Sequence, residues 1–101
     1  MSLDIAILAA NGAPTLSAGL GVEAHVEVLA MAQKQGAIQV QKMSEYYEDV
    51  DFEDAEVPLL RLELEGLRSS LSSESVRAVD EVIRVLREAE SKGVGVSAIA
   101  D

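Results

Sequence analysis

The first residues of the chain alternate between large aliphatic and smaller or polar side chains. In SLDIAIL (residues 2–8) the aliphatic positions are Leu3, Ile5 and Ile7, the period-two pattern of a strand with one buried face. Asn11-Gly12 is a dipeptide typical of tight hairpin turns. We therefore expect the chain to reverse at this turn and to form a short second strand within residues 14–21.

After the hairpin the apolar positions recur with the period of an α-helix. A first helix is expected from Val22 to Gly36, because glycine commonly ends helices. A shorter helix is expected over residues 38–47, although the alternation of Ile38 and Val40 also fits the start of a strand.

The two clearest helices lie in the second half of the chain. The first opens near Pro58 and should bury Leu60, Leu64, Leu67 and Leu71 before the serines of residues 69–73 end it. The second begins at Ser72 or Ser73, ends at Lys92 with Gly93 as its cap, and should bury Val76, Val79, Ile83 and Leu86. On its exposed face we expect two ion pairs at i,i+4 spacing, Asp80/Arg84 and Glu88/Lys92.

This order of elements predicts an α+β fold in which helices dominate. A small two- or three-stranded sheet, made of the N-terminal hairpin and a C-terminal strand within VGVSAIA (residues 94–100), should be covered by three or four helices. The 101 residues are enough for one core, so we expect a single domain over residues 1–101.

Composition removes several classes of protein and site. There is no cysteine, which excludes disulfides, zinc-thiolate sites and thiol nucleophiles. The first residues carry no basic region of the kind that precedes a signal sequence, and no apolar run approaches the roughly 18 residues of a membrane span. We expect a soluble cytoplasmic protein.

The net charge of −10 is concentrated in one segment. Residues 45–65 hold nine acids and one base, whereas residues 1–44 hold three acids and two bases and residues 66–101 hold six acids and five bases. Nucleic acids and anionic membranes would be repelled by such a field, so neither is an expected partner.

Three sequence features partly match known metal, nucleotide or catalytic sites, but none matches well enough to predict such a site. Asp49, Asp51 and Glu53 fit the first positions of a calcium-binding loop, but the required glycine is replaced by Asp54 and the required final glutamate by Leu60. GLGVEA (residues 19–24) fits a dinucleotide fingerprint but follows a weak strand and carries an acid in the helix's first turn. His25 has no evident triad partner in the sequence. We expect no metal, no cofactor, no catalytic residue and no enzymatic activity.

The segment EYYEDVDFEDAE (residues 45–56) combines seven carboxylates with all three aromatic residues of the chain. Aromatic side chains anchor interfaces and carboxylates attract cationic partners. The candidate partner-binding residues are Tyr46, Tyr47, Glu48, Asp49, Asp51, Phe52 and Glu53. The alternative is a solvated loop that one tyrosine and Phe52 hold against the core.

Two stretches, MSEYYEDVDF (residues 43–52) and GVGVSAIAD (residues 93–101), resemble a group of small acidic bacterial proteins. Some members of this group resemble the immunity proteins of polymorphic toxin systems. The resemblance covers about residues 42–65 and 91–101 and implies a cytoplasmic protein that binds and blocks a toxin domain, often a basic nuclease. Under this resemblance Tyr46, Tyr47, Glu48, Asp49 and Asp51 would carry the binding.

Two functional hypotheses follow. The first is a non-enzymatic acidic protein that binds a partner with a basic surface. The second is a structural or regulatory homo-oligomer, for instance a homodimer, in which an apolar helix face forms a symmetric interface.

Overall fold

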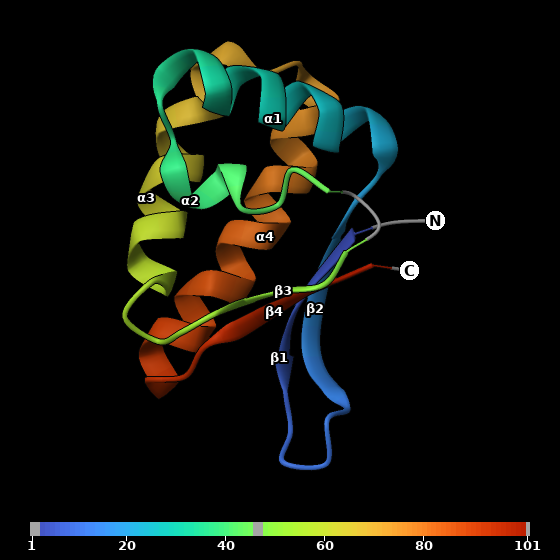
Figure 1. Cartoon of the computed structure of the whole chain (residues 1–101), viewed down its shortest axis with the longest axis vertical. Helices are drawn as coiled ribbons and strands as arrows, with labels where there is room; N and C mark the ends of the chain where they lie inside the picture. The colour runs from blue at the N-terminus through green and yellow to red at the C-terminus, as the bar shows by residue number, and fades with distance from the viewer. Residues whose placement is uncertain (1–2, 46–47, 101) are drawn as a thin grey trace.

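The computed structural model describes residues 3–45 and 48–100, and within them a four-stranded sheet lies against a layer of helices (Figure 1). The α+β class predicted from the sequence is confirmed. In chain order the elements are β1 (Leu3–Leu8), β2 (Pro14–Leu20), α1 (Val22–Gln35), α2 (Ile38–Gln41), β3 (Val50–Phe52), α3 (Val57–Leu67), the 3-10 helix η1 (Arg68–Ser70), α4 (Ser73–Lys92) and β4 (Val96–Ala100).

All strand pairs of the sheet are antiparallel, in the order β2-β1-β4-β3. The predicted hairpin is present, and Gly12 turns it with a positive φ of 84°. The predicted C-terminal strand pairs with β1 on its other side. The expectation of two or three strands was too low, because the three-residue β3 adds a fourth at the far edge of β4.

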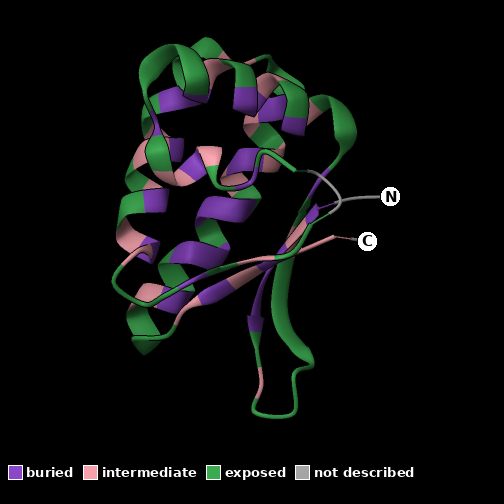
Figure 2. Ribbon diagram, in the orientation of Figure 1, coloured by how far each residue is buried: buried purple, intermediate pink, exposed green. Residues whose placement is uncertain are grey.

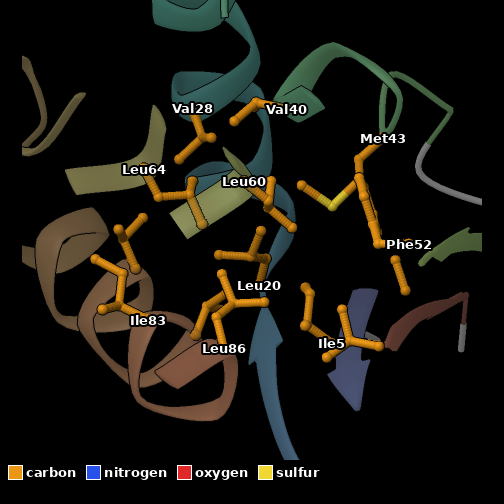
Figure 3. Close-up of a cluster of buried hydrophobic side chains, with 14 of the residues drawn as sticks. Ile5, Leu20, Val28, Val40, Met43, Phe52, Leu60, Leu64, Ile83 and Leu86 are labelled. Atoms are coloured by element: carbon orange, nitrogen blue, oxygen red, sulfur yellow. The ribbon is translucent and has the colours of Figure 1, made fainter. Parts of the chain in front are cut away.

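Alternation along the strands gives the sheet two different faces. Ile5 lies opposite Ala18 on one side and Ala98 on the other, on the face that the helices cover. The next position, Ala6, lies between Ser17 and Ser97 on the opposite face. Side chains from the covered face and from the helices form one buried cluster, part of which is shown in Figure 3.

Helix ends follow the sequence signals closely. α1 ends at Gly36 and α4 at Gly93, both with the left-handed backbone that glycine adopts without strain. The hydroxyl of Ser72 accepts a hydrogen bond from the Ser75 amide and so caps the start of α4. α2 is shorter than expected, since it covers only residues 38–41.

One predicted ion pair of α4 is wrong and the other is confirmed. Lys92 lies 3.5 Å from Glu88 as expected. Asp80, however, binds Arg68 rather than Arg84. Two guanidinium nitrogens of Arg68 reach the two carboxylate oxygens of Asp80 at 2.6 and 2.9 Å, a bidentate geometry that a single i,i+4 contact cannot match.

The predicted core faces of α3 and α4 are largely confirmed. Leu60, Leu64 and Leu67 are buried on α3, as are Val79, Ile83 and Leu86 on α4. Leu71 and Val76, which were also expected in the core, are only half-buried. Among the described residues, no helix combines the length and apolar character needed to traverse a lipid bilayer.

Candidate interaction surface

The short strand β3 places the acidic segment at one edge of the sheet. Val50 and Phe52 pair with Ala98 and Val96 of β4 and turn toward the helix layer. Asp51, between them, faces the other side and is exposed. The alternation therefore separates an apolar side of β3 from an acidic one.

Phe52 was predicted to bind a partner, but it is a core residue, and its burial argues against direct contact with a partner. Its side chain is only 2% exposed and belongs to the buried cluster that contains Met43, Ile5 and Leu20 (Figure 3). The ammonium of Lys42 lies 5.7 Å from the ring centroid, within the range of a cation–π contact. Phe52 thus fixes the acidic segment to the core, which is the part that the alternative interpretation assigned to this residue.

Two predicted site residues join β3 to β4 through their side chains. Asp49 Oδ1 accepts a hydrogen bond of 2.8 Å from the backbone amide of Ala100. Asp51 Oδ1 accepts one of 2.7 Å from the hydroxyl of Ser97. Each carboxylate keeps a second oxygen, and both residues are exposed. The two aspartates can therefore support the sheet and still meet a partner.

The remaining acids of the segment flank β3 at both ends. Glu48 and Glu53 are exposed, and Asp54 accepts a hydrogen bond from the Ala55 amide. Glu56 differs from them because it pairs with Lys42. The hydrogen bond from Lys42, assisted by one from the Glu53 amide, lowers the pKa of Glu56 below its ordinary value. We call Glu48, Asp49, Asp51 and Glu53 the acidic edge.

Tyr46 and Tyr47 lie outside the described residues. The chain enters this gap at Glu45 and leaves it at Glu48, and both of these residues are exposed. The structure therefore brings together four of the seven predicted binding residues, assigns Phe52 to the core, and says nothing of the tyrosines.

Exposed apolar side chains on α2 and α3 were not predicted. Leu59, Leu62 and Ile38 are 50%, 57% and 70% exposed. The carboxylate of Glu63 accepts hydrogen bonds from the backbone amides of Gln39 and Val40, which holds α2 against α3. The signal was present in the sequence, since residues 59 and 62 fall off the 60/64/67 stripe that α3 buries.

Most arginines gather away from the acidic edge, between α3 and α4. Arg68, Arg84 and Arg87 line an open hollow of about 450 Å³ together with Glu65, Asp80 and Ile83. Arg87 binds Glu65 at 2.6 Å, and Arg68 binds Asp80. Since carboxylates already hold these cations, the hollow is close to electrically balanced.

The candidate catalytic, nucleotide-binding and metal-binding residues of the sequence occupy ordinary positions in the fold. His25 is buried on α1, and its Nε2 lies 2.6 Å from the backbone oxygen of Met43. Gly19 and Gly21 do join a strand to a helix, but the sheet is antiparallel throughout, unlike a dinucleotide-binding unit. Across residues 3–45 and 48–100, no three metal-binding side chains converge on one point.

Comparison with other proteins adds no relative: no protein-family model, no curated protein and no solved structure matches this chain.

Proposed function

We propose that the protein is a non-enzymatic acidic binding protein whose acidic edge docks on a basic protein surface. The observation that carries the proposal is the exposure of all four acidic-edge carboxylates around one short strand that Phe52 anchors. An anchored strand presents its charges in a fixed arrangement, so binding loses less conformational entropy than it would with a mobile acidic loop.

The charge distribution favours a cationic partner over other partners. Residues 45–56 contain seven carboxylates and no base, and only Glu56 is neutralised by a nearby lysine. Exposed carboxylates that no nearby cation neutralises attract a basic surface and can accept bidentate hydrogen bonds from its arginines. The same anions would compete with a nucleic acid substrate for that surface.

This chemistry fits an immunity-type inhibitor that blocks a basic toxin or nuclease domain. Such an inhibitor needs no catalytic group of its own, because occupying the partner's cationic cleft excludes the substrate. The resemblance of about residues 42–65 and 91–101 to small acidic bacterial proteins, some of which resemble immunity proteins, led to the same hypothesis. The tyrosines at 46 and 47, between Glu45 and Glu48 in the chain, remain the aromatic candidates for contact.

The alternative is a homo-oligomer closed by an apolar helix face. The leucines of the α3 stripe, Leu60, Leu64 and Leu67, lie in the core. Apolar side chains that stay exposed on the helices, such as Leu59 and Leu62 of α3, would have to form the contact.

A double variant, Asp49→Asn with Asp51→Asn, tests the proposal. Asparagine keeps an oxygen acceptor for Ala100 and Ser97, so the sheet is preserved while two charges are removed. The assay is capture of basic toxin-type domains encoded beside this protein, followed by titration calorimetry. We expect affinity to fall about tenfold or more, with the effect largest at low salt.

The matched control removes two charges from another surface: Glu81→Gln with Glu88→Gln, both exposed on α4. This control should bind as the wild type does. Equal capture by the wild type and both double variants would contradict the assignment of the acidic edge.

A further inference from the structure

The two edges of the sheet are protected to very different degrees. β3 is three residues long and has carboxylates on both flanks, and these are standard means of preventing strand addition. β2 is seven residues long and, within the part of the chain that the structure describes, pairs only with β1. Within residues 16–19, where the pairing with β1 is regular, every second residue directs its backbone groups to the outer side.

The second half of β2, residues 16–20, has no charged side chain to protect it. No charged residue occurs from Ile5 to Val22, a run of 18 positions in a chain of net charge −10. The hairpin has a bulge in which Thr15 of β2 is the extra residue, since Ile7 pairs with Leu16 and Leu8 with Pro14. The bulge and Pro14 interrupt only the first two residues of β2, so residues 16–20 form a regular, uncharged edge. Figure 2 shows β2 exposed along nearly its whole length.

The hairpin also leaves two apolar side chains partly exposed. In Figure 1 the β1–β2 turn extends beyond the helix layer. Leu16 lies opposite Ile7 on the covered face of the sheet, yet it is 38% exposed, as is Leu8. An uncharged edge with exposed leucines beside it is a surface suited to another strand.

We propose that β2 pairs with β2 of a second copy of this chain, antiparallel and centred on Ser17, to give one continuous eight-stranded sheet. Two identical chains related by a two-fold axis pair their edge strands in this direction. Centring on Ser17, the middle of β2, places Leu16 opposite Ala18 of the copy on the covered face. The exposed leucine then gains apolar cover.

Charge selects a second copy over a basic partner at this edge. A cationic protein has nothing to bind in an uncharged hairpin and is attracted to the acidic edge instead. In the paired sheet the two β3 strands are seven inter-strand spacings apart, or roughly 34 Å at about 4.8 Å each. That is about four times the Debye length of about 8 Å at physiological salt, so the two acidic edges hardly repel each other.

Light scattering after size exclusion, over a dilution series, tests the pairing. Because one strand edge is a small interface, we expect a monomer–dimer equilibrium with Kd of roughly 10–100 µM. Ser17→Glu and Ser17→Lys should each remain monomeric, since like charges then face each other across the axis. An equimolar mixture of the two should regain the dimer mass.

The control is Gln33→Glu, which adds the same charge to an exposed position of α1 and should dimerise as the wild type does. Thermal unfolding of every variant is measured alongside, to show that the fold is kept. A wild-type monomer at all concentrations up to about 500 µM, a dimeric Ser17→Glu, a monomeric Gln33→Glu or a monomeric mixture would each overturn the proposal. Asp49→Asn with Asp51→Asn should leave dimerisation unchanged, so the result is independent of the function proposed for the acidic edge.

Discussion

Asp49 and Ala100 are joined by a hydrogen bond of 2.8 Å from the backbone amide of Ala100 to the carboxylate of Asp49. Asp49 precedes β3 and Ala100 ends β4, so the side chain extends the pairing of these strands by one residue. An acid that the sequence marked only as a binding residue therefore also takes part in the fold.

Replacing Asp49 by alanine should separate these two roles. Asp49→Ala removes the acceptor, and we expect the free energy of unfolding to fall by about 0.5–1.5 kcal/mol. Asp49→Asn keeps an acceptor and should be close to wild type. Urea unfolding followed by circular dichroism measures both, and equal stability of the two variants would show that the Ala100 hydrogen bond contributes nothing.

Phe52→Leu should lower stability without affecting partner capture. The substitution keeps an apolar side chain in the core but leaves part of the ring's volume empty, which costs about 1–2 kcal/mol. Chemical denaturation gives the loss, and the capture assay for the acidic edge gives the binding. Weaker capture by a variant that is fully folded at the assay temperature would return Phe52 to the binding surface.

Phe52 and β3 show which features of the acidic segment the sequence can and cannot decide. Co-location of Phe52 with carboxylates suggested a shared surface, but alternation along β3 turns neighbouring side chains to opposite faces. β3 itself was missed because three residues are too few to show a period. Its strand conformation comes from pairing with β4 and from burial of Phe52, which are both long-range effects.

The helix ends could be predicted from the sequence because capping residues next to each end determine them. Gly36 and Gly93 adopt left-handed backbone at the ends of α1 and α4, and Ser72 caps α4 through its own hydroxyl. The partner of Asp80 was not accessible, since Arg68 reaches it only once η1 has folded beside α4.

Glycines 95 and 66 should respond to alanine in opposite directions. A Cβ at residue 95 would collide with the backbone oxygen of Phe52, so Gly95→Ala must displace β3 and should cost about 1–3 kcal/mol. Residue 66 is exposed within α3 and has open space around it, so Gly66→Ala should stabilise by about 0.5–1 kcal/mol. Denaturant midpoints of the two variants, measured against wild type, check both signs.

Acid should weaken the junction between α1 and α4. Glu27 accepts hydrogen bonds from the Ser72 amide and from the hydroxyls of Ser75 and Ser72. These bonds, the Ser72 amide foremost, lower the pKa of Glu27 below its ordinary 4.5. A lowered carboxyl pKa stabilises the fold above pH 4.5, and this contribution is lost as pH falls through the folded-state value.

Glu27→Gln isolates that contribution. The difference in unfolding free energy between wild type and Glu27→Gln should be largest near pH 7 and should shrink below pH 4.5. Denaturant titrations at pH 3, 4.5 and 7 measure it. The matched control is Glu74→Gln, which removes an exposed carboxylate from the first turn of α4. A pH-independent difference between wild type and Glu27→Gln would show that ionisation of Glu27 does not support the junction.

The unlike edges of the sheet have a consequence for assembly. Once β2 of one chain has met β2 of another, each end of the joined sheet is a β3, too short and too acidic to accept a further strand. If the proposed pairing forms, association by this route should therefore stop at two chains and not continue into a filament.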